Sequence, residues 1–384
     1  MSSHVSINPA LLTWARERSG ADVFVLEGRF PKLAAWEAGD AQPTLKQLED
    51  FARAVHVPIG YLFLPEPVRE TLPVTDFRTV AGHAAQRPSP DLLDTIYLCQ
   101  QRQDWFRDHA RMNAFPLLDF IGSVSISTDP VAVAESMGRT LNLSLTERQQ
   151  LPSWEDALRQ LILKVEEAGV MVMTSSIVGN NSRRTLRVEE FRGFALADAL
   201  APLVFINGAD SKAAQMFTLM HELAHLWLGE SGISNIETGR LPGQHTERWC
   251  NAIAAEFLMP MQAIHEAYRA DQSLSEEVTR LARIFKVSTL VALRRVFDAG
   301  FIDQEQLWQH YRTELAHIQT RSQRSIGGGD FYRSLGARAS KRFARALLAS
   351  TLEGQTLFRD AFRLLGVKKS DTLFSAARAL GVTP

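Results

Sequence analysis

The sequence has few cysteines and no long hydrophobic run. Only two of its 384 residues are cysteines, Cys99 and Cys250, and they stand far apart. This excludes a framework of disulfide bonds and favours a reducing compartment. The apolar stretches are too short to span a bilayer, and no basic start followed by an apolar run marks a signal peptide. We therefore expect a cytoplasmic protein without a membrane partner.

The composition is that of an ordinary globular protein, but the charge is unevenly distributed. Hydrophobic residues make up 45% and charged residues 22% of a length that favours two or three domains. Residues 1–70 hold seven Lys/Arg against nine Asp/Glu, a net charge of −2, whereas residues 321–384 hold twelve against four, a net charge of +8. The basic end favours an acidic partner, with DNA as one candidate; a solvated helical surface is the alternative explanation.

Residues 9–64 have the pattern of short helices. Asn8 before Pro9 is typical of a helix start, and Ser19-Gly20 marks its end. A further helix is predicted to start near Thr44. Its apolar residues repeat at spacings of three and four: Leu45, Leu48, Phe51 and Ala52.

The middle of the chain mixes helix and strand signals. Residues 82–91 resemble a linker, and a helical pattern follows from Leu92 to about Leu151. Strands are predicted in the apolar stretches 169–174, 191–198 and 202–208. After Thr246 every segment has a helical pattern except SIGGGD at 325–330. The order is therefore helical, then a small α+β unit, then helical again.

The stretch HELAHLWLGE contains an HExxH motif on a predicted helix at 211–228, with Gly229 as its end. Residues four apart on a helix project from the same face, so His221 and His225 are placed to share one metal ion. Glu222 lies about 100° further around the helix. It is placed to touch a water on the metal rather than the metal itself.

A catalytic zinc site needs a third protein ligand. Glu247 is the favoured candidate, because Asn251 stands one helical turn further on and is placed to hydrogen-bond a ligating histidine. Glu256 competes for the role but falls on the opposite face of the same helix. His245 and Cys250 are further candidates.

These residues predict a specific chemistry. Zn²⁺ held by two imidazoles and a carboxylate would polarise a water and the scissile carbonyl, with Glu222 as general base. A further donor would stabilise the oxyanion. The polar groups nearby in sequence, His245, Arg192 and Tyr268, do not single out one residue for that role.

HELAHLWLG followed by ERWCNAIAAEFLMP resembles the ImmA/IrrE metallopeptidases, and RGFALAD…PLVFING is similar to the strand pair before their zinc helix. Cys250 and Ile253 depart from the usual alanine and phenylalanine of that pattern. The resemblance covers about residues 150–265. It implies the same three metal ligands and the same catalytic base.

Two other segments resemble helix-turn-helix modules. The N-terminal LAAWEAGDAQPTLKQLEDFARAVHVPIGYLF is similar to Xre/lambda-repressor domains, although ADVFVLEGRF is an unusual second helix and Lys32 is nearly the only basic residue in the recognition segment. Residues 275–303 contain a second such pattern with Arg294 and Arg295, which together with Lys32 are the candidates for DNA contacts. A helical hairpin packed on the peptidase unit is the alternative for that segment.

The predicted fold is mainly α, with a small α+β zincin-like peptidase domain and helical N-terminal and C-terminal domains. The predicted parts are an Xre-like helix-turn-helix domain (1–75), a helical connector (76–150), the peptidase domain (151–265), a helical, helix-turn-helix-like part (266–320) and a basic helical C-terminal region (321–384).

Three functions are compatible with these features. The first is a zinc endopeptidase that acts as a regulatory switch, because the resemblance implies cleavage of a repressor protein under stress. The second is a DNA-binding transcriptional regulator or antitoxin-like protein whose zinc domain senses or scaffolds. The third, a structural zinc protein, is disfavoured because structural sites usually have four protein ligands. The candidate partners are a protein substrate, from a neighbouring gene or the chain's own helix-turn-helix part, DNA, and a second copy forming a homodimer.

Overall fold

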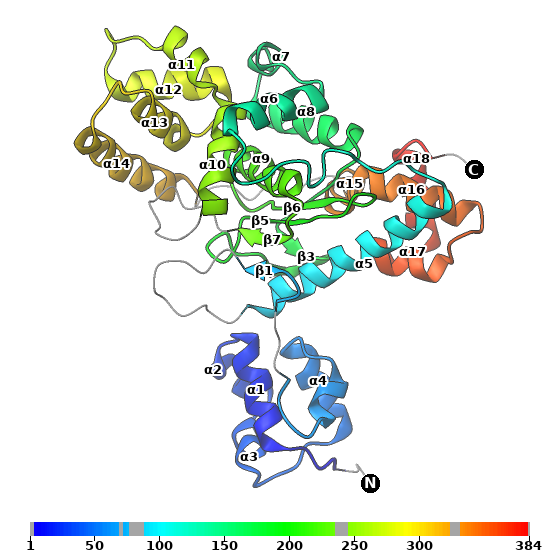
Figure 1. The fold of residues 1–384 in the computed structure, drawn as a ribbon. Coiled ribbons are helices and arrows are strands. Elements are labelled where there is room, and N and C mark those ends of the chain that lie inside the picture. The colour runs from blue at the N-terminus through cyan, green and yellow to red at the C-terminus, as the bar shows by residue number, and fades with distance from the viewer. Residues whose placement is uncertain (1–3, 69–71, 77–87, 235–244, 323–330, 383–384) are drawn as a thin grey trace. The chain divides into compact units, whose positions relative to one another are not determined.

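The computed structural model describes residues 4–68, 72–76, 88–234, 245–322 and 331–382. Its internal contacts divide the chain into two bodies, one of residues 1–73 and 86–96 and the other of residues 74–85 and 97–384. The described elements are mostly helical, and a small mixed sheet lies in the middle of the sequence (Figure 1). This confirms the predicted fold class.

The first body is a cluster of short helices around its own core. The two predicted helix starts are confirmed. The side chain of Asn8 accepts a hydrogen bond from the Ala10 amide at 3.1 Å, and Thr44 forms a capping box with Gln47. The core is made of buried side chains from every helix, Leu11, Leu26, Trp36, Phe51 and Leu62 among them. The elements are α1 (Pro9–Ser19), α2 (Val23–Arg29), α3 (Leu33–Ala38), α4 (Leu45–Ala54) and the 3₁₀ helix η1 (Ile59–Phe63).

Helix α2 forms although its sequence is poor in helix-favouring residues. Its N-cap Asp22 accepts a hydrogen bond from the Phe24 amide at 2.8 Å, and Leu26 is buried in the core. One cap and one anchoring side chain therefore outweigh the weak propensity of the β-branched and aromatic residues. The remaining apolar residues stay outside, and Phe24 is 83% exposed.

The second body is built on a five-stranded mixed sheet. The strand order is β1 (Thr75–Asp76), β7 (Gly232–Ser234), β5 (Gly193–Leu196), β6 (Leu203–Asn207) and β2 (Met171–Ser175). The outer pairs β1–β7 and β2–β6 are parallel, whereas β5 is antiparallel to both of its neighbours. Strands β5 and β6 lie in their predicted stretches, and β2 ends one residue beyond the predicted stretch 169–174. The sequence did not indicate β1, β7 or the separate hairpin of β3 (Ile177–Val178) and β4 (Asn181–Thr185).

Both faces of the central strands are covered, which explains their continuous apolar sequences. Val172, Val204 and Ile206 belong to the core shared with helices α8 (Trp154–Glu167) and α9 (Lys212–Leu228). On the other face, Met173 contacts Cys99 and Arg102 of α5 (Pro90–Met112).

Further helices extend the core beyond α9. Helix α10 (His245–Leu258) packs against both α9 and α6 (Pro130–Leu141). The remaining helices of this part are α7 (Leu145–Gln149), α11 (Met261–Ala267), α12 (Leu274–Phe285), α13 (Thr289–Asp298) and α14 (Gln304–Ser322). The segment 113–129, predicted as helical, is instead a loop with turns. Its residues serve as packing and hydrogen-bond partners, as Thr128 does for Trp249.

The C-terminal helices are joined to the sheet unit by specific polar contacts. The Arg102 guanidinium donates to the carbonyls of Leu364 and Arg338 at 3.0 and 2.8 Å. The Ser340 hydroxyl donates to Glu166 at 2.5 Å. This region comprises α15 (Phe331–Ala339), α16 (Lys341–Leu352), α17 (Phe358–Leu365) and α18 (Ser370–Ala379).

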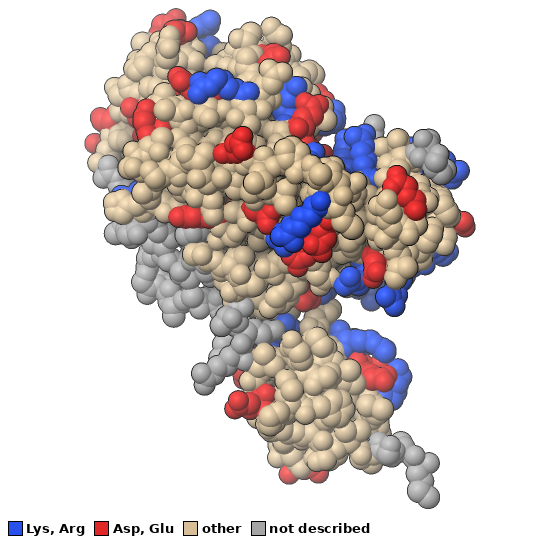
Figure 2. Space-filling model, turned by 45° about the vertical axis from the view of Figure 1, so that its right-hand side comes forward, with Lys and Arg blue, Asp and Glu red and all other residues tan. Residues whose placement is uncertain are grey.

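Some basic residues of the C-terminal region have structural roles. Arg345 donates to the Leu380 carbonyl at 2.9 Å, and burial lowers the pKa of Arg342. On the face drawn in Figure 2, basic and acidic residues are interspersed. Most of the predicted linker 82–91 and all of SIGGGD (325–330) lie outside the described residues. Each helix among the described residues is too short or too polar to cross a membrane.

Candidate metal centre

Helix α9 carries the HExxH motif and begins and ends as its sequence predicts. The Ser211 hydroxyl accepts a hydrogen bond from the Ala214 amide at 3.2 Å, and Gly229 ends the helix with a left-handed φ of 75°. Nearly every side chain in the second half of the helix is buried. The motif is therefore held inside the core, between the sheet and α10.

Two histidines and one glutamate converge at a single buried point. The Nε2 atoms of His221 and His225 are 3.2 Å apart. Oε2 of Glu247 lies 3.3 Å from Nε2 of His221, and its Oε1 lies 3.0 Å from Nε2 of His225. Both histidines are fully buried, and Glu247 is 6% exposed. Among the described residues, this is the group whose donor atoms are close enough to share a metal ion.

Helix α10 places the favoured third candidate and its expected companion as the helical spacing predicts. The Asn251 side-chain oxygen is 3.0 Å from Nδ1 of His221. When that Nδ1 carries the proton, it donates to Asn251, and the lone pair of Nε2 points to the shared centre. The structure thus brings together the two histidines, Glu247 and Asn251.

The other candidates for the third ligand lie elsewhere. Glu256 forms an ion pair with Arg295 and accepts a hydrogen bond from the Met261 amide at 3.1 Å. His245 is exposed. Cys250 is buried, and burial together with nearby carboxylates raises the pKa of its thiol well above the usual range. The thiol is not among the converging donor atoms.

The converging atoms fit a tetrahedral zinc ion. Ligand atoms about 2.0–2.1 Å from a tetrahedral zinc stand about 3.3–3.4 Å from one another. The distances of 3.0–3.3 Å between donor atoms, of which the two to Glu247 run to different oxygens of its carboxylate, are close to the edges of such a tetrahedron. Two imidazoles and one carboxylate are also ligand types that zinc prefers. With Glu222 alongside, two carboxylates share this buried volume, a charge that a divalent cation would balance.

The electrostatics show strong coupling within the cluster. Burial lowers the pKa of His221, but the carboxylates of Glu247 and Glu222 more than offset this and raise it above its usual value. Burial also lowers the pKa of His225, and there the carboxylate does not reverse the effect. Burial alone would raise the pKa of Glu247, yet the two imidazoles hold it well below the usual range.

Glu222 is fully buried beside the cluster and packs against the start of β5. Burial raises its pKa to about 8, whereas the charge of His221 and the hydroxyl of Ser234 act in the opposite direction. The strand residue that it meets is Gly193. A Cβ at that position would lie 3.1 Å from Oε1 of Glu222 and 2.5 Å from a methyl carbon of Thr218. The absence of a side chain at Gly193 therefore makes room for the carboxylate.

Ser234 is a member of the site that the sequence did not indicate. It ends β7, is fully buried, and places its Oγ 3.2 Å from Nε2 of His221 and 3.5 Å from Nε2 of His225. A lone serine at the end of a three-residue strand has no spacing relation to HExxH. Only the sheet register brings it to the histidines.

The residues predicted to contact DNA lie in separate places. Lys32 is exposed at the N-cap of α3. Arg294 pairs with Asp298 at 2.9 Å on the surface of α13. Arg295 is buried, and its guanidinium donates to the Met259 carbonyl at 2.9–3.0 Å and to Glu256. The structure gives Arg295 an internal role, which leaves its guanidinium no surface for a phosphate.

The residues considered for oxyanion stabilisation also have other contacts. Arg192 pairs with Asp210 at 2.8 Å, and Tyr268 stacks on Phe301 with ring centroids 3.9 Å apart.

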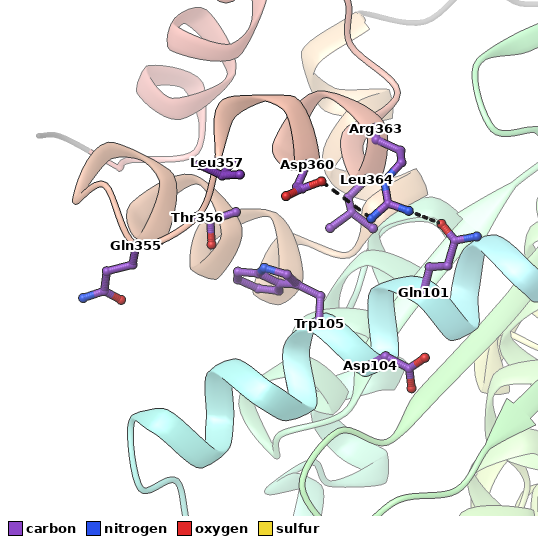
Figure 3. Close-up of a pocket in the computed structure, with 9 residues that line it drawn as sticks. All are labelled: Gln101, Asp104, Trp105, Gln355, Thr356, Leu357, Asp360, Arg363 and Leu364. Carbon is purple, nitrogen blue, oxygen red and sulfur yellow. Dashed lines mark hydrogen bonds and ion pairs between the residues drawn. The ribbon is translucent and has the colours of Figure 1, made fainter.

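A surface pocket of about 440 Å³ lies apart from the metal centre, between α5 and the segment leading into α17 (Figure 3). Trp105 and Leu364 line it together with polar groups. Its charged groups are paired: Arg363 bonds Gln101 at 3.2 Å and lies 3.9 Å from Asp360, and Asp104 pairs with Arg107 outside the pocket. Because these charged groups are paired, the pocket has no predominant positive or negative charge that would select a charged ligand.

The region that contains this cluster is similar to a known family. Residues 165–297 match the model of the IrrE N-terminal-like domain, Peptidase_M78. The matched region includes the converging donors and runs through α13. Residues 339–379 match a domain of unknown function, DUF8813, which corresponds to α16–α18. No match to a curated protein was found. Neither family match reaches residues 1–75, so their helix-turn-helix identity stays a prediction.

Proposed function

We propose that the chain is a zinc-dependent endopeptidase of the ImmA/IrrE type that acts in the cytoplasm as a regulatory switch by cleaving a specific protein. The observation that carries the proposal is the convergence of two HExxH histidines and Glu247 at 3.0–3.3 Å inside a region similar to the IrrE N-terminal-like domain. The proposed substrate is a transcriptional repressor or another partner, such as the product of a neighbouring gene.

The residues have distinct roles in the proposed reaction. His221, His225 and Glu247 hold the metal, and Asn251 keeps His221 in the ligating tautomer. When bound, the metal supplies a Lewis acid for the scissile carbonyl and the attacking water. Glu222 accepts the proton of that water and delivers it to the leaving amine. Its buried position beside Gly193 keeps the carboxylate out of bulk solvent. Burial raises its pKa above that of an exposed glutamate.

The burial of the cluster supports a narrow rather than a general peptidase. His221, Glu222 and His225 are all fully buried. We infer that a peptide bond reaches these atoms after neighbouring segments move, and that a specific partner supplies the binding energy for such a movement. We therefore expect little cleavage of unrelated proteins such as casein.

The test is incubation of the purified full-length chain with the protein products of adjacent genes, followed by mapping of new termini. Wild type should cleave one of them. Glu222→Gln should keep one zinc per chain and lose cleavage by roughly 10²–10⁴-fold, because only the proton transfer is removed. Glu247→Ala should lose both zinc and cleavage.

The result also separates the two leading functions. Full biological effect of the Glu222→Gln variant would overturn the peptidase proposal and favour the DNA-binding regulator. In that case DNA-shift assays of the full-length chain at several salt concentrations should show binding that weakens as salt rises. A wild-type chain that binds no zinc under these conditions would contradict both readings of the metal centre.

A further inference from the structure

Ser234 places its hydroxyl beside both converging histidine nitrogens, in a class of site that usually keeps one coordination position open for water. Its Oγ stands 3.2 and 3.5 Å from the Nε2 atoms of His221 and His225. These two distances are close to the 3.0–3.3 Å that separate the three donors from one another. The hydroxyl therefore stands beside both converging histidine nitrogens and also bonds the carboxylate of Glu222, among atoms from β7, α9 and α10.

The backbone around Ser234 holds the hydroxyl in this position. Ser234 pairs with Gly193 in the antiparallel β5–β7 ladder, and its carbonyl accepts a hydrogen bond from the Arg192 amide at 3.2 Å. The side chain is fully buried. A one-residue slip of β7 would turn it to the other face of the sheet, so the register of the strand fixes the contact.

We propose that the hydroxyl oxygen of Ser234 is a fourth protein donor to the metal when no substrate is bound. This inference rests on the proposed zinc function. The donor set is then two imidazoles, one carboxylate and one hydroxyl, and the site is closed. Opening the position for water requires β7 to withdraw Ser234. The resting state is thus inactive because a weak neutral ligand occupies the place of the water.

Cobalt substitution tests this assignment without a substrate. Co²⁺ reports its ligands through its absorption spectrum, and a thiolate ligand adds a charge-transfer band in the near ultraviolet. Ser234→Cys, kept reduced and loaded with Co²⁺, should gain such a band. Wild type supplies the baseline, since it already contains Cys250 near the centre. The matched control is Ser231→Cys, three residues earlier and about 10 Å away along an extended chain, which should gain no band.

A second variant gives an independent readout. Ser234→Ala removes the donor, so azide should change its cobalt spectrum at a concentration roughly tenfold lower than in wild type, because no internal ligand competes. Zinc affinity should stay within about tenfold of wild type, since the three stronger ligands remain.

The outcomes separate this inference from the proposed function. Ser234→Cys that binds one Co²⁺ per chain without a thiolate band would overturn the fourth-ligand assignment and leave the metal centre intact. If Ser234→Cys does not fold, equal azide responses of Ser234→Ala and wild type would overturn it. A wild-type chain that binds neither Zn²⁺ nor Co²⁺ would instead refute the zinc site itself.

Discussion

At single positions around the cluster, the contacts explain which residue type is present. Gly193 leaves the space that Glu222 occupies, since a Cβ there would also lie 2.9 Å from the Phe205 carbonyl oxygen. We expect Gly193→Ala to lower the free energy of unfolding by about 1–3 kcal/mol through overpacking. It should also displace Glu222, which reduces cleavage more than zinc binding. Chemical denaturation and metal analysis of the same samples measure both effects.

The closest atom to that added methyl group is Cγ2 of Thr218, at 2.5 Å. Thr218→Ser removes this carbon and is therefore the matched second change. The double variant should recover part of the lost stability. Equal stability of Gly193→Ala and wild type would show that the strand and helix move apart without cost, contrary to the packing described.

Asn251 contacts His221 and is not one of the three converging donor residues. Its side-chain oxygen lies 3.0 Å from the histidine Nδ1. Removing such a hydrogen-bond partner of a metal ligand typically costs 10–100-fold in metal affinity. We predict that Asn251→Ala weakens zinc binding by about this factor, as measured by competition with a chelator. Asn251→Asp, which keeps an acceptor, should retain zinc better than the alanine variant.

The residues of the metal site differ in how well the sequence predicts them. His221, Glu222 and His225 follow from one helix and a fixed spacing, and the pair of Glu247 and Asn251 follows from the face of a second helix. Ser234 and Gly193 could not be predicted in this way. They reach the site through strand pairing, and pairing depends on the whole sheet rather than on local spacing.

At the scale of elements, the contact between α10 and α13 explains why Glu256 does not join the cluster of converging donor atoms. Its carboxylate and the Arg295 guanidinium form an ion pair whose side chains are 13% and 7% exposed. Loss of one partner of a buried ion pair typically costs 3–5 kcal/mol. Glu256→Ala should therefore lower stability by roughly 3 kcal/mol in denaturant unfolding, while zinc content stays at the wild-type level. Loss of zinc without loss of stability would contradict this assignment.

The junction of α8 with α16 should make stability depend on pH. Burial raises the pKa of Glu166, although the hydroxyl of Ser340 opposes the shift. A carboxyl group with a raised pKa stabilises the fold fully at pH values below its unfolded pKa. That stabilisation is lost as pH rises through the folded pKa. We predict that the free energy of unfolding falls less in Glu166→Gln than in wild type when the pH is raised from 4 to above the folded-state pKa of Glu166.

Parallel denaturation series of wild type and Glu166→Gln measure this difference, and other titrating groups cancel in the comparison. Identical pH dependence of the two proteins would show that Glu166 does not couple folding to protonation. Ser340→Ala is a useful companion, because it removes both the partner of Glu166 and the N-cap of α16.

The elements themselves were predictable where their patterns are long and regular. Helix α9 and strands β2, β5 and β6 have strong apolar patterns and lie close to where the sequence predicts them. Strand β1 has two residues and β7 three, too few to show a period. The attachment of the C-terminal helices could not be predicted either. It depends on pairs such as Arg102 with Leu364, which lie 262 positions apart.

At the scale of the whole chain, the metal should stabilise one of the two bodies. The donor atoms all lie in the body of residues 74–85 and 97–384, and the helical body has a separate core. A ligand that binds only the folded state stabilises it by about 4 kcal/mol at 1,000 times its Kd. For a body of this size, that corresponds to a rise in Tm of roughly 6 °C.

We therefore predict two calorimetric transitions for the full-length chain, of which EDTA lowers only one. The Glu247→Ala variant should show the lower temperature already without EDTA and no further decrease with it, because its ligand set is incomplete. Variants in the helical body, such as Leu48→Ala, should move the other transition alone, since Leu48 is fully buried in that core. A single transition that EDTA and both variants shift together would show that the two cores unfold as one cooperative unit.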